Sequence, residues 1–267
     1  MTVSLVRVEI EAPFCWIVLN SPSTMNALSM PLLEELEDAV RQVAANPEVR
    51  CVIVTGEGKA FSAGGDLAGF KSDIDAQQYN RFLARLEYAQ AVFNLVESLP
   101  MPVIAAVNGV AVAGGLELLL CCDILYAADT ARIGDGHAKY GVIPAGGSSV
   151  RLPARVSPGW ASEMLFSGSL YPAETLRERG LINRVVPQAE LYDAVRELAR
   201  TLCQRSPRGL VVMKQLMRQS RGGPVSQGLR AEIGAFASYA KSEDFREGLA
   251  AFAEKRNPVF GGRQDPR

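Results

Sequence analysis

Two glycine-rich turns, each placed after an apolar, strand-like run, constrain this chain more than any other feature. Residues 61–66 (FSAGGD) follow the run 51–55, and residues 112–117 (VAGGLE) follow the run 103–107. Glycine has no Cβ, so backbone N–H groups at such turns can approach a ligand closely. Where a turn enters a helix, these N–H groups have no partner within the helix. Two such turns, the second ending in an acid, predict a site that polarises a carbonyl beside a general acid or base.

The rest of the pattern predicts an α/β protein with a helical C-terminal region. Strands are expected at 16–19, 51–55, 103–107 and 123–126, and helices at 31–45, 76–98 and 115–121. Further helices are expected at 188–205, 209–218, 226–240 and 242–255. We therefore expect a core with the binding and catalytic site over residues 1–186 and a helical oligomerisation region over residues 187–267. The long apolar faces of the second region need a partner, such as another subunit.

Composition excludes several classes of protein. The chain has 28 Lys+Arg against 29 Asp+Glu, which gives no sign of a nucleic-acid or membrane-surface partner. No run reaches the ~18 apolar residues of a membrane span, and the N-terminus resembles no targeting signal. The five cysteines form neither a CxxC pair nor a Cys/His metal spacing, so we expect reduced thiols, no metal site and a cytoplasmic protein.

Three common catalytic or nucleotide-binding motifs are absent from the sequence. The segment 56–60 lacks the spacing of a phosphate-binding loop, and the first glycine turn lacks the third glycine of a dinucleotide fingerprint. No GxSxG motif occurs, so a serine hydrolase triad cannot be drawn.

Motifs along nearly the whole chain, including both turns, resemble the enoyl-CoA hydratase/isomerase, or crotonase, superfamily. They lie at 19–28 (LNSPSTMNAL), 58–67 (GKAFSAGGDL), 102–109 (PVIAAVNG), 114–117 (GGLE), 122–124 (CDI), 141–144 (GVIP), 151–152 (RL) and 251–256 (AFAEKR). The resemblance implies a crotonase-like ββα spiral with a helical C-terminal trimerisation region, assembled as a homotrimer or a dimer of trimers. It also implies an acyl-CoA thioester as substrate, so coenzyme A enters as part of the substrate and no separate cofactor is expected.

The resemblance assigns roles to the residues of the two turns. The N–H groups of Gly65 and Gly114 match an oxyanion hole for the thioester oxygen, which gains negative charge as water adds at C3. Glu117 matches one of two catalytic glutamates in the family's hydratases. Its apolar neighbours are expected to raise the pKa of its carboxyl group toward that of a base useful at neutral pH. The alternative is a glutamate held by the helix dipole or by an arginine.

The chain departs from the family pattern at His137, its only histidine, which stands where the second glutamate is expected. A histidine can donate or relay a proton near neutral pH, so Glu117 and His137 together predict hydration of a 2-enoyl-CoA. Alternatives are Δ3,Δ2-enoyl-CoA isomerisation by Glu117 alone, hydrolysis of an acyl-CoA or β-diketone using His137, and an acyl-CoA-binding protein without turnover. A structural alternative for His137 is an imidazole bonded to a loop carbonyl. Ala145 after Pro144 is a second departure, at the family's proline-glycine turn.

The resemblance also implies where coenzyme A binds. Four positions match backbone that holds the pantetheine and adenine, and two match residues that a neighbouring subunit brings to the adenine and phosphates. These six positions are Ala27, Ala63, Asp66 and Leu67, then Phe252 and Lys255. Lys255 supplies positive charge for the phosphates, although a solvated helix end is the simpler explanation. Residues 70–86 are expected to border the acyl group.

Overall fold

Two β-sheets form the centre of the molecule in this computed structural model, which describes residues 4–261. The larger sheet contains, in spatial order, β1 (Val6–Glu11), β2 (Phe14–Leu19), β3 (Cys51–Gly56), β5 (Val103–Val107), β7 (Ile124–Ala128) and β10 (Arg184–Val186). The smaller sheet contains β4 (Ala60–Ser62), β6 (Val110–Val112), β8 (Arg132–Gly134) and β9 (Tyr171–Pro172). Strand pairs β1–β2 and β8–β9 are antiparallel, and the other neighbouring strands are parallel.

The chain builds the two sheets together. In each of the pairs β3–β4, β5–β6 and β7–β8, the first strand joins the larger sheet and the second joins the smaller one. Helical segments follow each pair before the next strand begins. The repeating ββα arrangement expected from the sequence is confirmed. Because the glycine turns follow β4 and β6, which are paired in the smaller sheet, the fold brings these turns side by side.

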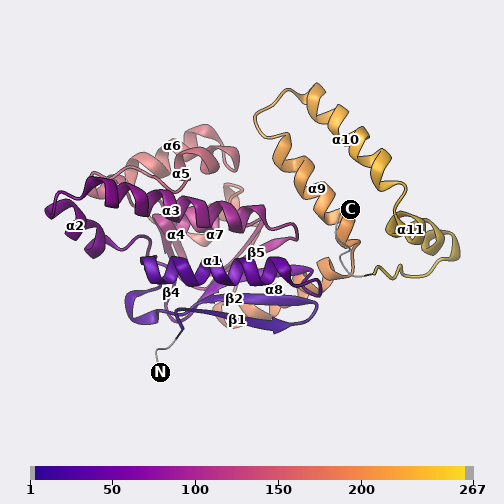
Figure 1. Cartoon of the computed structure of the whole chain (residues 1–267), viewed down its shortest axis with the longest axis horizontal. Coiled ribbons are helices and arrows are strands. Elements are labelled where there is room, and N and C mark those ends of the chain that lie inside the picture. The colour runs from indigo at the N-terminus through magenta and orange to yellow at the C-terminus, as the bar shows by residue number, and fades with distance from the viewer. Residues whose placement is uncertain (1–3, 262–267) are drawn as a thin grey trace.

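The described part of the chain contains eleven α-helices, most of which surround the sheets (Figure 1). In chain order they are α1 (Met30–Ala45), α2 (Leu67–Asp75), α3 (Tyr79–Ser98), α4 (Gly114–Leu119), α5 (Ser148–Arg151), α6 (Pro158–Ser167), α7 (Ala173–Glu178), α8 (Leu191–Cys203), α9 (Pro207–Gln219), α10 (Val225–Tyr239) and α11 (Glu243–Glu254). Short 3-10 turns are η1 (Pro22–Thr24), η2 (Ala138–Tyr140), η3 (Leu152–Ala154) and η4 (Gln188–Glu190).

The larger sheet is buried on both faces, which explains the continuous apolar runs of its central strands. Alternate residues of one strand, such as Val52 and Val54, join the main core with α1, α3 and α4. Their neighbours Cys51 and Ile53 join a second core under α8. All five cysteines are buried and unpaired.

The predicted start of the helix over residues 76–98 is wrong. The prediction also lacks the helix that precedes it. The structure instead has α2, then a break, and then α3 from Tyr79. Gln77 has a φ of 56°, which a right-handed helix does not allow. Asp66 starts α2 as its N-cap by accepting a hydrogen bond from the N–H of Gly69 at 3.1 Å.

The C-terminal region divides into a packed helix and a projecting arm. Helix α8 lies on the larger sheet, whereas α9, α10 and α11 extend away from it (Figure 1). Large apolar side chains on the arm are exposed, among them Met217, Val225, Ile233, Phe236 and Phe252. The domain boundary at residue 187 stays a prediction. The last six residues of the expected C-terminal region, 262–267, lie outside the described residues. Among residues 4–261, no helix combines the length and apolar character needed to cross a bilayer.

Candidate active site

The first glycine turn is fixed by buried hydrogen bonds to the segment before α1. The hydroxyl of Ser62 donates to the carbonyl of Asn26 at 2.8 Å and accepts from the N–H of Gly64 at 3.2 Å. The N–H of Leu28 donates to the carbonyl of Gly64 at 2.8 Å. Gly64 has a φ of 91°, and a Cβ there would lie 2.7 Å from the carbonyl oxygen of Val112. Only glycine fits, so the turn packs directly against the second one.

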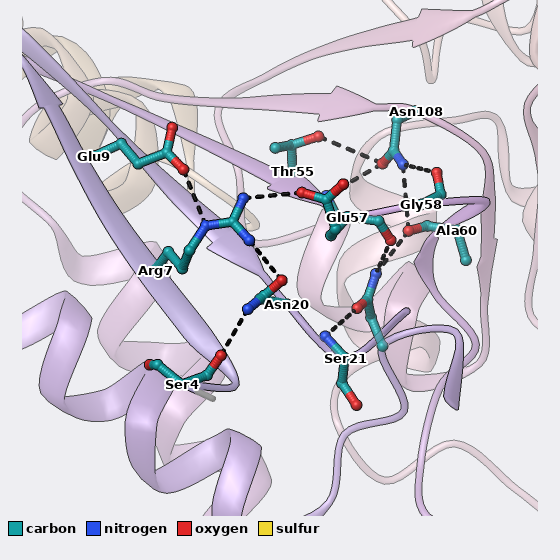
Figure 2. Close-up of polar contacts among 12 residues, drawn as sticks. Ser4, Arg7, Glu9, Asn20, Ser21, Thr55, Glu57, Gly58, Ala60 and Asn108 are labelled. Atoms are coloured by element: carbon teal, nitrogen blue, oxygen red, sulfur yellow. Dashed lines mark hydrogen bonds and ion pairs between the residues drawn. The ribbon is translucent and has the colours of Figure 1, made fainter. Parts of the chain in front are cut away.

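Two buried asparagines hold the loop that leads into this turn. Asn26 donates to the carbonyls of Glu57 and Ala60 at 3.0 and 2.8 Å. Asn108 lies between Thr55, Gly58 and Ala60, with its amide group directed at the loop (Figure 2). Because buried amides that are fully bonded rigidify their surroundings, the backbone at Gly65 is held in place before any ligand binds.

The second turn uses an unusual backbone conformation to start α4. Ala113 has φ 52° and ψ −118°, a region that non-glycine residues rarely adopt. Its N–H donates to the carbonyl of Gly134 at 3.2 Å, which anchors the strained residue. A Cβ on Gly114 would lie 3.4 Å from the nitrogen of Gly65, so the two amides are neighbours. Within residues 4–261, neither amide has a protein acceptor.

Glu117 lies in the first turn of α4 and is 4% exposed. Its Oε1 accepts hydrogen bonds from the N–H groups of Gly146 and Ser148, at 2.7 and 3.2 Å. Its Oε2 accepts none from the described side chains or backbone. Burial raises the pKa of this carboxyl group, and the two amide bonds and the nearby His137 oppose the rise. No arginine pairs with Glu117 among the described ion pairs; Arg151 pairs with Glu97 instead. The position of Glu117 in the first turn of α4 is the one that the helix-dipole alternative expects.

His137 lies at the start of η2. Its charge lowers the pKa of Glu117, and the charge of Glu117 raises the pKa of His137. Its Nδ1 is 3.0 Å from Oδ2 of Asp135, a fully buried carboxylate. Burial lowers the pKa of the imidazole, but the hydrogen bond and charge of Asp135, together with the charge of Glu117, raise it overall. The partner is therefore a carboxylate, and the alternative of a loop carbonyl is wrong.

One cavity of about 690 Å³ brings most of the predicted site residues together. Gly65, Gly114, Glu117 and His137 all line it, from the two glycine turns, α4 and η2. The remaining wall is mostly apolar and comes from α1, α2, α3 and the loop before α5. Its large apolar side chains are Leu28, just before α1, and Met30, Leu33, Leu67, Phe70, Ile74, Phe82, Leu83, Leu86, Phe93, Val142 and Ile143. Seven of the residues 70–86 line this cavity, and the expectation that they border the acyl group stays a prediction.

The positions expected to hold coenzyme A fall into three groups. Asp66 and Leu67 line the cavity, at the start of α2. Ala27 and Ala63 do not line the cavity. Ala27 directly precedes Leu28, which does line it, and Ala63 lies two residues before Gly65, which also lines it. The N–H of Ala63 donates to the carbonyl of Met25 at 2.9 Å. Phe252 and Lys255 lie on and after α11, at the opposite end of the long axis from α2 (Figure 1). Coenzyme A binding at these six positions stays a prediction.

Three residues that shape the site are missing from the sequence prediction. They are Asn26, Asp135 and Arg151. Arg151 donates to the carbonyl of Gly146 at 2.8 Å while pairing with Glu97 at 2.9 Å, which holds the turn that binds Glu117. Of these three residues, only Asp135 has a local signal in the sequence, which is its place two positions before His137. Among residues 4–261, no group of three or more acidic, histidine or cysteine side chains is arranged to hold a metal ion.

Comparison with known proteins decides the family. The family model described as enoyl-CoA hydratase/isomerase matches residues 9–263. The chain belongs to the enoyl-CoA hydratase/isomerase family. A crotonyl-CoA hydratase from Syntrophomonas wolfei is 35% identical over 253 residues, covering 94% of this chain and 96% of that relative. A carnitinyl-CoA dehydratase from Citrobacter koseri is 37% identical, covering 95% and 97%.

Solved structures agree with the family assignment and with its fold. The crystal structure of an enoyl-CoA hydratase from Bacillus anthracis superposes with a TM-score of 0.91 at 33% identity, covering 97% of this chain and 100% of that one. An enoyl-CoA hydratase from Polaromonas sp. JS666 gives a TM-score of 0.91 at 30% identity, covering 96% and 99%. The expected crotonase-like fold with a helical C-terminal region is confirmed, and the family supports an acyl-CoA thioester as substrate.

Proposed function

We propose that this member of the enoyl-CoA hydratase/isomerase family is an enoyl-CoA hydratase, which adds water across the 2,3 double bond of an enoyl-CoA thioester. One observation carries the proposal. A single apolar cavity is lined by Gly65 and Gly114, by the buried carboxylate of Glu117 and by the imidazole of His137. Such a cavity combines groups that stabilise a developing oxyanion with two groups that exchange protons.

The two glycine amides act as the oxyanion hole in this proposal. Addition of water at C3 moves negative charge onto the thioester oxygen and gives an enolate-like transition state. The N–H groups of Gly65 and Gly114 are adjacent and lack protein acceptors within the described residues, so both can donate to that oxygen. Because the turns are fixed by buried hydrogen bonds, little reorganisation is needed when charge develops.

Glu117 acts as the general base and His137 as the proton donor. Oε1 of Glu117 is held by two amides, which leaves Oε2 to take a proton from the water that attacks C3. The imidazolium of His137 gives a proton to C2, so the water molecule is added without loss or gain of atoms. Proton transfer from Glu117 back to His137 through solvent restores both groups.

The cavity wall favours an apolar acyl group. The two cations in the wall besides His137 are already paired: the Arg85 guanidinium lies 2.7 Å from Oδ2 of Asp73, and Lys71 pairs with Asp75. A distal carboxylate on the substrate would therefore find no unpaired lysine or arginine in this lining. Burial of each additional methylene contributes about 0.8 kcal/mol, so longer straight acyl chains are the preferred substrates.

We also propose that the chain works as a homotrimer or a dimer of trimers, in which a neighbouring copy brings Phe252 and Lys255 to the coenzyme A. Phe252 is 86% exposed, and α11 lies far from α2 (Figure 1), whose residues line the cavity. The mass of the particle in solution, measured by sedimentation, tests this assembly. A monomer would contradict it.

The activity is tested by incubating the purified protein with a 2-enoyl-CoA and following the absorbance of the conjugated thioester. Hydration removes the conjugation and yields a 3-hydroxyacyl-CoA, identified by mass. Two further incubations separate the alternatives within the family: a gain of conjugation from a 3-enoyl-CoA indicates isomerisation, and release of free thiol indicates hydrolysis. Binding of the thioester without any turnover would indicate an acyl-CoA-binding protein and would overturn the proposal.

A further inference from the structure

Asp135 is a buried carboxylate with one side-chain partner. It follows β8, is 0% exposed, and its Oδ2 accepts from the backbone N–H of His137 at 3.4 Å as well as facing Nδ1 at 3.0 Å. Its Oδ1 has no hydrogen-bond partner among the described residues. A buried carboxylate is strongly unfavourable unless it is paired. His137 is therefore the group that compensates Asp135, and Asp135 in turn constrains His137.

The contact with Asp135 fixes which imidazole nitrogen is available for chemistry. An ionised carboxylate is only an acceptor, so Nδ1 of His137 carries the proton in this contact. Nε2 is then the only nitrogen of the ring left for the cavity, which His137 lines. In the charged form Nε2 carries a proton that it can give to a ligand, and in the neutral form it carries a lone pair.

The charges around His137 favour the protonated form. Asp135 lies in direct contact with the ring and Glu117 lines the same cavity from α4, and both raise the pKa of the imidazole against the effect of burial. On η2 itself, the ammonium of Lys139 lies over the ring of Tyr140. Helix α6 packs against η2, and its one charged side chain, Glu163, accepts a hydrogen bond from the Tyr171 hydroxyl at 3.4 Å.

We propose that Asp135 is a positioning residue that holds His137 through Nδ1, so that Nε2 faces the cavity as the nitrogen that delivers a proton. The site then contains a carboxylate base, Glu117, and an imidazolium acid, and the buried carboxylate behind the ring assigns the acid role. Delivery of that proton to C2 of an enoyl thioester rests on the proposed function. The tautomer and charge of His137 do not.

The experiment uses the fact that His137 is the only histidine in the chain. Imidazole 15N chemical shifts of the full-length protein therefore report the tautomer and the titration midpoint of this one ring without assignment. We expect the Nδ1–H form when the ring is neutral and a midpoint above 6.5 in the wild type. A midpoint at or below 6.5, or an Nε2–H tautomer, would overturn the proposal, even if no variant can be purified.

The variant Asp135→Asn keeps the size of the side chain and removes its charge. We expect the midpoint of His137 to fall, the alkaline limb of kcat/KM to move to lower pH, and kcat at pH 8 to fall about tenfold. Asp38→Asn is the matched control, because Asp38 is an exposed carboxylate on α1, and it should leave the midpoint unchanged. An unchanged midpoint in Asp135→Asn would contradict the inference.

The two proposals fail separately in these measurements. If the titration follows the expectation but the protein does not hydrate any 2-enoyl-CoA, the role of Asp135 stands and the hydratase proposal is wrong. If hydration occurs but Asp135→Asn leaves the midpoint of His137 unchanged, the role of Asp135 is wrong and the hydratase proposal stands.

Discussion

Replacing Glu117 by glutamine separates its role in catalysis from its role in the fold. The side chain of glutamine has the same length and keeps one carbonyl oxygen. That oxygen can still accept the hydrogen bonds from Gly146 and Ser148 that Oε1 accepts at 2.7 and 3.2 Å. The turn before α5 should therefore stay in place, and only the ability to take a proton from water is lost.

The size of the effect follows from the proposed role of Glu117. General base catalysis contributes ~10²- to 10⁴-fold, so kcat of Glu117→Gln should fall by at least ~10²-fold, which is about 2.7 kcal/mol of transition-state stabilisation. KM should change little, because the apolar wall and the glycine amides are unaltered. The assay is the loss of the conjugated thioester absorbance, compared with the wild type at equal protein concentration.

The same variant should not lose stability. Burial raises the pKa of Glu117 above its ordinary 4.5, so between that value and the pKa of the folded protein the folded state binds more protons than the unfolded state. The free energy of unfolding of the wild type therefore falls as pH rises through this interval. Glutamine has no such ionisation. We expect Glu117→Gln to be at least as stable as the wild type at pH 8, in urea unfolding followed by circular dichroism.

Unchanged turnover in a folded Glu117→Gln variant would refute the reasoning about the base. A variant that is inactive and also clearly less stable at pH 8 would refute the reasoning about the buried charge.

Three further predictions concern the same cavity. Gly146→Ala should lower kcat about tenfold or more, because a Cβ there would lie 2.5 Å from Oε2 of Glu117 and would displace the carboxylate; Gly159→Ala on α6, where a Cβ meets nothing within 4 Å, is the control and should leave kcat unchanged. The pH profile of kcat/KM should be bell-shaped, with its acidic limb above 4.5 from Glu117 and its alkaline limb above 6.5 from His137, since both pKa values are raised; a profile that is flat from pH 5 to 9 would contradict these roles. In a series of straight-chain 2-enoyl-CoA substrates, kcat/KM should rise about fourfold per added methylene until the cavity is filled, and a decrease from the four-carbon substrate onward would contradict an apolar acyl site.

The sequence predicts the glycine turns and four of the ten described strands, β2, β3, β5 and β7 of the larger sheet, because these features are local. Apolar runs such as Val103–Val107 and the two glycine pairs are read from neighbouring residues, and the structure places them as expected. Helix α2 is missed because it is short and only Asp73 on it is buried, so it lacks a long apolar stripe.

The missing parts of the site depend on contacts between distant segments. The amide of Gly146 reaches Glu117 only because the loop before α5 folds back over α4, and Arg151 fixes that loop through Glu97 on α3. Local spacing carries no sign of either contact. The pair formed by Asp135 and His137 is the exception, since the two residues are neighbours in sequence, but only the burial of Asp135 shows that the contact has a consequence.

The most direct test of the account is a crystal structure of Glu117→Gln with a 2-enoyl-CoA bound. We predict that the thioester oxygen lies about 3 Å from the backbone nitrogens of both Gly65 and Gly114, with C3 facing residue 117. A thioester oxygen that contacts neither amide, or amides that have turned to protein acceptors in the complex, would contradict the central claim.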